Sequence, residues 1–192
     1  MPTEQVQVTL TVGDVLEQLG VPYFIGGSMA GAVHGVIRAT MDTDIIADLQ
    51  PGHAEPLVSS LGIGFFTVIE NIRSAIFART TFSVVHMEST FKVDIFLLKE
   101  RAFGQSEMQR RALHVISTDP DRSAYVASAE DTILAKLEWF RLGGEMSENQ
   151  WLDVLGILKV QAGSLDTGYL HEWAGSLAVR DLLEKALVET GG

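Results

Sequence analysis

The sequence predicts an α/β protein, α+β in detail, in which a small mixed β-sheet with helices is followed by a helical C-terminal part. Two observations support this. The runs Phe82–Met87 and Phe91–Leu98 are rich in β-branched and aromatic residues and are separated by a short polar turn, which is typical of a β-hairpin. From Ala129 onward, apolar residues recur at helical spacing. We therefore expect an α/β core over residues 1–120 and a helical region over residues 121–192 that packs on the core.

The elements of the core follow from the spacing of apolar residues and from the positions of glycine and proline. We expect helices over most of 9–19 and at 29–36, 51–61 and 100–111, and strands at 23–25, 42–48, 65–69, 75–78, 82–87, 91–98 and 112–116.

The helical part begins at a clear capping signal. Ser128 precedes the periodic stretch 129–142, so we expect it to cap that helix. Ser147 is placed to cap a second helix, and its stretch 151–158 is apolar nearly all round, which indicates burial. Further helices are expected at 166–174 and 179–190.

One ionisable residue, Asp153, interrupts the apolar stretch of the second helix. A buried carboxylate is unfavourable without a partner, and either Lys136 or Arg141 would serve. Lys136 lies at the edge of the buried face of its own helix, where a lysine either extends to solvent or reaches a buried anion.

Two aspartates near the start of the chain are separated by one residue. Asp42 and Asp44 lead into the apolar run 45–47, which is typical of a strand covered on both faces. Residues i and i+2 of a strand point to the same face, so the two carboxylates lie side by side. Such like charges repel each other unless a cation lies between them, and carboxylate oxygens suit Mg²⁺. The pair therefore predicts a Mg²⁺ or Mn²⁺ site.

A glycine-rich turn precedes this pair. Gly26, Gly27 and Ser28 follow the expected strand 23–25 and lead into a short helix, so their backbone N–H groups are candidates for binding an anion. Arg38, further along, is suited equally to steadying a phosphate and to pairing with an aspartate. A phosphate-binding turn together with metal-binding carboxylates is typical of phosphate-transfer chemistry.

The turn Gly26–Ser28, the pair Asp42-x-Asp44 and a lone aspartate, Asp94, on a later strand together resemble the nucleotidyltransferase superfamily with the polymerase-beta-type fold. The segment from Arg38 to Asp44 is similar to a small bacterial branch that includes abortive-infection-type toxin nucleotidyltransferases. The resemblance covers roughly residues 20–98. From the residues alone, Asp94 fits either a third carboxylate or the exposed face of an edge strand, and the resemblance favours the former.

The resemblance implies a metal-dependent enzyme that transfers a nucleoside monophosphate from a nucleoside triphosphate, such as ATP, to an acceptor hydroxyl. The metal ligands and catalytic carboxylates would be Asp42, Asp44 and Asp94, and two Mg²⁺ ions, or Mn²⁺, would be the cofactors. The phosphate-binding residues would be Gly26, Gly27, Ser28, Arg38 and Lys136, with Lys136 counted among the catalytic residues. Lys136, Arg141 and Asp153 resemble a downstream motif of the same branch, although Asp153 fits a structural ion pair nearly as well.

Composition limits the partners. The chain has 25 acidic and 14 basic residues and a net charge of −11, which disfavours nonspecific nucleic-acid binding. It has no cysteine, which excludes disulfides and fits a reducing cytosol. No apolar run has membrane-spanning length and the N-terminus lacks the pattern of a signal peptide, so we expect a cytoplasmic protein without membrane contact.

Several alternatives stay open. The acceptor is a tRNA, a protein or a small cationic molecule. The rival function is a catalytically inactive module that binds a nucleotide or a partner, or a toxin–antitoxin component with an antitoxin-like partner. A homo-oligomer is also open. A dinucleotide-binding glycine fingerprint is excluded, because Ser28 stands where its middle glycine is needed.

Overall fold

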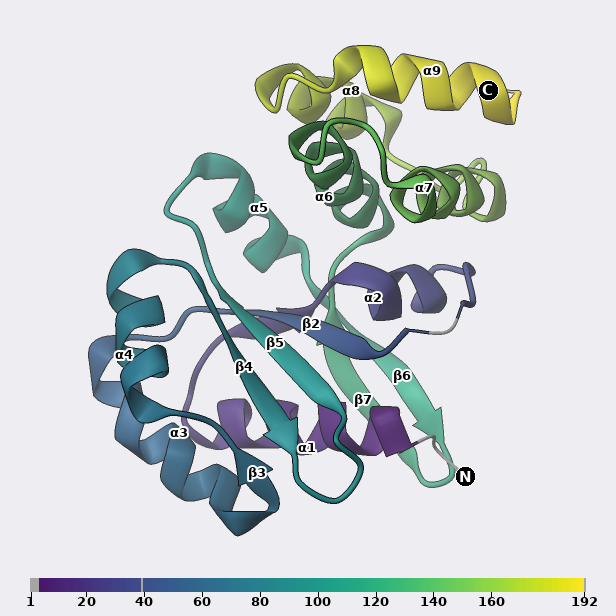
Figure 1. Cartoon of the computed structure of the whole chain (residues 1–192). Coiled ribbons are helices and arrows are strands. Elements are labelled where there is room, and N and C mark those ends of the chain that lie inside the picture. Colours follow the sequence, from purple (N-terminus) through teal and green to yellow (C-terminus); the bar gives the residue numbers. More distant parts are fainter. Residues whose placement is uncertain (1–3, 39, 192) are drawn as a thin grey trace. The chain divides into compact units, whose positions relative to one another are not determined.

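The computed structural model describes residues 4–38 and 40–191, and it alternates helices with strands up to residue 126 and contains only helices beyond it (Figure 1). Two compact units can be distinguished. The first takes in the described residues up to Gly26 and those from 40 to Val126. The second takes in Gly27–Arg38 and the described residues from Ala127 onward.

The first unit is a mixed sheet with helices. Its strands are β1 (Tyr23–Ile25), β2 (Asp42–Ala47), β3 (Phe65–Phe66), β4 (Thr81–His86), β5 (Lys92–Leu97), β6 (Ala112–Thr118) and β7 (Asp121–Val126). Its helices are α1 (Glu4–Gln18), α3 (Ala54–Leu61), α4 (Ile69–Ala78) and α5 (Ala102–Arg110), with 3-10 turns η1 (Pro51–His53) and η2 (Gly62–Gly64). Within the described residues the strand order is β3-β4-β5-β2-β1-β7-β6. Strands β2 and β5 are parallel neighbours, and β1 and β4 flank them antiparallel.

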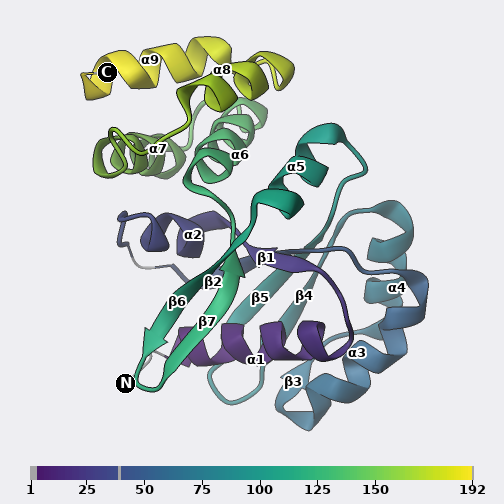
Figure 2. The same ribbon diagram turned by 180° about the vertical axis from the view of Figure 1, so that it is seen from behind.

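The two faces of this sheet differ in character. In β2 and β5 every second residue is buried, as expected when one face packs on the core. Thr43 lies on the buried face, where its hydroxyl is 3.0 Å from that of Thr9 on α1. Helix α1 covers this face (Figure 2), and its buried residues recur at helical spacing. The half-exposed residues of β2 and β5 therefore point to the opposite face.

The second unit is helical. It contains α2 (Gly27–Val33), α6 (Ala129–Leu142), α7 (Glu148–Val160), α8 (Thr167–Ser176) and α9 (Arg180–Thr190). The hydroxyl of Ser128 accepts a hydrogen bond from the N–H of Asp131, and that of Ser147 accepts one from the N–H of Gln150, so both predicted caps are confirmed. Apolar residues of α6 and α7, such as Leu137 and Ile157, are fully buried.

The predicted fold class is confirmed, and so is the β4–β5 hairpin. Three element predictions were wrong. Residues 75–78 belong to helix α4, whose buried Ile72, Ala75 and Ile76 follow helical spacing. The strand predicted at 65–69 is limited to two residues, and α1 begins at Glu4 instead of residue 9.

The sequence analysis also missed β7, because it assigned no strand to residues 121–126. No helix in the described part of the chain combines the length and apolar character needed to cross a membrane.

Candidate active site

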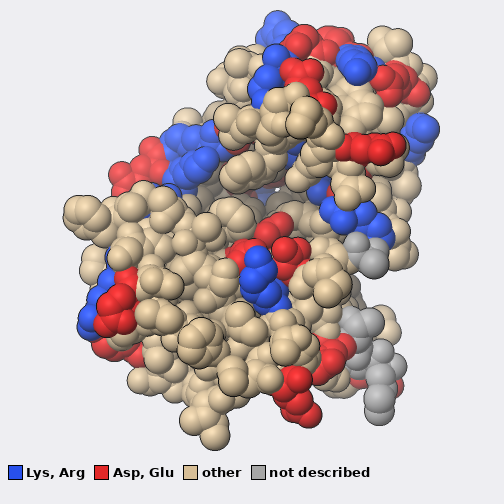
Figure 3. All heavy atoms as spheres, viewed as in Figure 1, with Lys and Arg blue, Asp and Glu red and all other residues tan. Residues whose placement is uncertain are grey.

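The predicted carboxylates come together on one face of the sheet in the first unit. In the parallel register of β2 and β5, Asp44 stands opposite Asp94, and Asp42 stands opposite Lys92. Since side chains alternate along each strand, these four lie on the same face, away from α1. Figure 3 shows acidic and basic side chains gathered over β2 and β5. From the sequence, only Asp42 and Asp44 could be placed on a shared face, and the register of β2 and β5 adds Asp94 to it.

The ammonium group of Lys92 lies among these carboxylates. Its Nζ donates to Oδ2 of Asp94 at 2.6 Å and lies 3.8 Å from Oδ2 of Asp42. The hydrogen bond to Asp94 raises the pKa of Lys92 above its usual value, and the negative charges of Asp94, Asp42 and Asp44 raise it further. This follows because each of these contacts favours the charged form of the lysine.

Two hydroxyl groups also donate hydrogen bonds to these carboxylates. Ser83 on β4 donates to Oδ1 of Asp94 at 2.5 Å, so both oxygens of Asp94 are engaged, one by Ser83 and one by Lys92. Thr40 donates to Oδ1 of Asp42 at 3.0 Å. The sequence interpretation gave no role to Ser83 or Lys92, although the alternation of β5 already placed Lys92 on the face of Asp94.

The donor set fits a divalent metal ion in its chemistry. Asp42, Asp44 and Asp94 offer hard carboxylate oxygens, and a cation, the Lys92 ammonium, is already drawn to two of them. In their present orientations, however, no three histidine, aspartate or glutamate side chains of the described residues form a group that would hold a metal ion. The ammonium lies on Oδ2 of Asp94, which is one of the oxygens that such an ion could use.

A second cluster of predicted residues lies within the helical unit. The carboxylate of Asp153, which is 2% exposed, accepts a hydrogen bond from Nζ of Lys136 at 2.7 Å. Arg38 donates through Nε to both carboxylate oxygens of Asp153, at 3.1 and 3.2 Å. The same arginine donates through Nη2 to Oγ of Ser28 at 2.5 Å. The unit therefore brings Arg38 and Lys136 to one buried carboxylate, and Arg38 links Ser28 to it.

Of the two partners predicted for Asp153, only Lys136 is confirmed. Arg141 instead forms ion pairs with Asp181 and Glu145 at the surface. The sequence allowed Arg38 to pair with an aspartate, but it could not identify Asp153 as that aspartate, because the two residues are 115 positions apart.

The two glycines of the turn have different local roles. The N–H of Gly26 donates to the carbonyl oxygen of Asp44 at 2.9 Å, which uses it within the sheet. A Cβ at Gly26 would come within 2.8 Å of the end of the Ile46 side chain, which would have to shift to make room for it. Gly27 has φ of 56°, a left-handed conformation that glycine adopts without strain, and α2 begins there instead of at residue 29.

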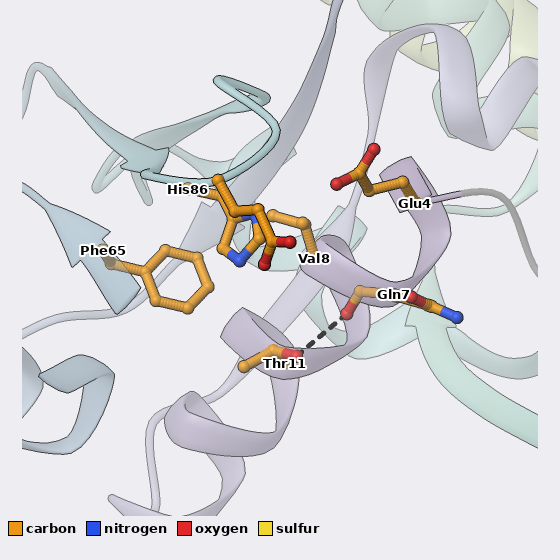
Figure 4. A pocket seen from close by; sticks show the side chains of 7 residues that line it. Glu4, Gln7, Val8, Thr11, Phe65 and His86 are labelled. Atoms are coloured by element: carbon orange, nitrogen blue, oxygen red, sulfur yellow. Dashed lines mark hydrogen bonds between the residues drawn. The ribbon is translucent and has the colours of Figure 1, made fainter. Parts of the chain in front are cut away.

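A separate pocket of about 520 Å³ lies beside α1 in the first unit. It is lined by Glu4, Gln7, Val8, Thr11, Phe65, His86 and Glu88 (Figure 4). The rings of Phe65 and His86 are 5.2 Å apart on the α1 side of the sheet. The pocket is therefore on the face opposite the carboxylates and is not part of the candidate active site.

Comparison with solved structures identifies the fold. The chain aligns with ANT(2'')-Ia, solved in complex with adenylyl-2''-tobramycin, at a TM-score of 0.61 and 13% identity over 93% of this chain and 99% of that one. It aligns with the lincosamide antibiotic adenylyltransferase LnuA, solved with lincomycin, at a TM-score of 0.53 and 18% identity over 83% of this chain and 98% of that one. This chain has the nucleotidyltransferase fold.

An antigenic nucleotidyltransferase-like protein from Paracoccidioides brasiliensis has the same fold, at a TM-score of 0.56 and 17% identity over 97% of this chain and 94% of that one. No protein-family model matches the sequence, and no curated protein sequence matches it either. The resemblance to the nucleotidyltransferase superfamily is thus confirmed in the fold, and the abortive-infection-type branch stays a prediction.

Proposed function

We propose that this protein is an enzyme that transfers a nucleoside monophosphate from a nucleoside triphosphate to an acceptor hydroxyl. The observation that supports this most is the register of β2 and β5. Within a nucleotidyltransferase fold, it sets Asp44 opposite Asp94 and leaves Asp42 on the same face of the sheet. These carboxylates lie on adjacent strands of a sheet, a rigid element that can keep them in position for chemistry.

In this proposal Asp42, Asp44 and Asp94 hold Mg²⁺ or Mn²⁺. When bound, the metal neutralises phosphate charge and activates the acceptor hydroxyl. The acceptor oxygen bonds to the α-phosphorus as the bond to the bridging oxygen of pyrophosphate breaks, and pyrophosphate leaves. We assign Asp94 to the acceptor side, where its carboxylate takes the proton of the attacking hydroxyl.

We assign Ser28, Arg38 and Lys136 to the triphosphate. Arg38 and Lys136 both donate to the buried carboxylate of Asp153, which fixes the position of each cation. Cationic side chains that are already fixed in position can stabilise the negative charge of a phosphate without having to move during the reaction. The backbone of Gly27 completes the predicted phosphate-binding turn, whereas the N–H of Gly26 already donates to Asp44 within the sheet.

For the acceptor we propose a small cationic molecule that carries a hydroxyl group. The net charge of −11 supports this choice, because an acidic protein attracts a cation and repels the phosphate backbone of RNA. ANT(2'')-Ia, which has the same fold, was solved in complex with adenylyl-2''-tobramycin, in which an adenylyl group is joined to tobramycin.

Label transfer tests the proposal. Purified protein is incubated with each α-labelled nucleoside triphosphate, Mg²⁺ or Mn²⁺ and cell extract, after which RNA, protein and small molecules are separated. Wild type should label the small-molecule fraction. Asp44→Asn should label nothing, whereas the control Asp48→Asn should remain active, since Asp48 pairs with Arg79 and lies outside the cluster.

The other outcomes separate the alternatives. Label in RNA or protein would keep the chemistry and change the acceptor. Nucleotide binding without label in any fraction would favour a catalytically inactive binding module.

A further inference from the structure

Lys92 places a positive charge beside the proposed metal ligands. Its ammonium contacts Oδ2 of Asp94 at 2.6 Å and approaches Oδ2 of Asp42 to 3.8 Å, in the midst of the proposed metal ligands. Its side chain is 41% exposed, compared with 16% for that of Asp94. The charged end therefore lies against the carboxylates while much of the side chain is in contact with solvent.

We propose that Lys92 is a built-in cation that neutralises the aspartate face in the metal-free protein and competes with the metal ion for Asp94 and Asp42. The inference rests on the proposed function, because it takes these carboxylates to be metal ligands. Beyond the proposed function, it assigns to Lys92 the role of setting the affinity of the site for the metal ion.

The geometry supports displacement of the ammonium, not simultaneous binding. Both oxygens of Asp94 already accept hydrogen bonds, one from Ser83 and one from Lys92. A metal ion that takes Oδ2 must remove the ammonium from it, since two cations on one oxygen repel each other. A lysine has a flexible four-carbon stem and a half-exposed one can withdraw into solvent, so the exchange needs no movement of the sheet.

The competition has two opposite consequences. Without metal, Lys92 relieves the repulsion among Asp42, Asp44 and Asp94 and stabilises the fold. With metal, the cost of displacing the ammonium weakens binding. Replacing Lys92 by the uncharged Met should therefore strengthen metal binding and weaken the metal-free protein together, a combination that loss of a merely structural side chain would not produce.

Titration with Mn²⁺ tests the inference in the absence of nucleotide. The electron paramagnetic resonance signal of free Mn²⁺ gives the dissociation constants of wild type, Lys92→Met, Lys92→Arg and Asp44→Asn at one fixed pH. Lys92→Met should bind Mn²⁺ about three- to tenfold more tightly than wild type, the range expected from removing one exposed competing charge. Lys92→Arg keeps the charge and should stay within about twofold of wild type.

Thermal unfolding supplies the second readout. In a chelator, Lys92→Met should unfold at a lower temperature than wild type, and saturating Mn²⁺ should raise its midpoint by more than it raises that of wild type. Equal or weaker Mn²⁺ binding by Lys92→Met would overturn the inference while leaving the metal site in place. If wild type bound Mn²⁺ no better than Asp44→Asn, the metal assignment of the proposed function would fail, and the role of Lys92 with it.

Discussion

Replacing Asp153 by Asn should strongly destabilise the helical unit. Asp153 and Lys136 form an ion pair at 2.7 Å with side chains only 3% and 4% exposed. Removing one member of a buried pair leaves the other charge uncompensated, which costs about 3–5 kcal/mol. Arg38, the other partner, is 31% exposed, so water can replace its lost contact and it adds little to this cost.

Urea unfolding followed by tryptophan fluorescence measures this effect selectively. Trp139, Trp151 and Trp173 are the three tryptophans of the chain, and all belong to the helical unit. With a urea dependence of about 2 kcal/mol/M, a loss of 3–5 kcal/mol lowers the midpoint by about 1.5–2.5 M. The matched control is Asp181→Asn, which removes an exposed partner of Arg141 and should leave the midpoint unchanged.

A second variant tests whether the buried charge is the cause. Asp153→Asn combined with Lys136→Met removes both charges and should recover part of the lost stability. A midpoint for Asp153→Asn within about 0.5 M of wild type would refute the reasoning. So would a double variant whose losses simply add, because the two side chains would then not act as a pair.

Two further predictions concern the fold. Gly35→Ala should lower the stability of the helical unit by about 2–3 kcal/mol, because Gly35 has φ of 105° and a Cβ there would collide with the Val160 side chain. The control is Gly163→Ala, which is also at positive φ but has open space around it. It should cost only about 1 kcal/mol in the same urea assay. Burial, and then the neighbouring Glu17, raise the pKa of Tyr23, so the folded state favours the neutral phenol. The resulting stability is present below about pH 10 and declines as the pH rises above it, and calorimetry of Tyr23→Phe should show a weaker decline than wild type.

Part of the candidate site could be predicted from the sequence because it depends on residues that are close together in the chain. The i, i+2 spacing of Asp42 and Asp44 is enough to put two carboxylates on one face of a strand. The place of Asp94 depends on which strands pair and in what register, and β2 pairs with β5 across about fifty intervening positions. Pairing of that kind is decided by the whole sheet, so only the resemblance to a known fold suggested it.

The contacts that control the charges were harder to predict. The position of Lys136 at the edge of a buried helical face was enough to suggest its pairing with Asp153. The hydrogen bonds from Arg38 to Asp153 could not be predicted in this way, because they depend on segment Gly27–Arg38 belonging to the same unit as α7. Helix α4 was mistaken for a strand because its apolar residues form short runs that fit either period, and packing of the helix decided between them.

The most direct test of the central claim compares two positions of the label in the nucleotide. Wild type is incubated with a nucleoside triphosphate labelled at the α-phosphate and, separately, at the γ-phosphate, together with the acceptor fraction and Mg²⁺. Nucleotidyl transfer through Asp42, Asp44 and Asp94 predicts that the α-label joins the acceptor, that the γ-label leaves as pyrophosphate, and that Asp44→Asn abolishes both. Transfer of the γ-label to the acceptor, or full activity of Asp44→Asn, would contradict it.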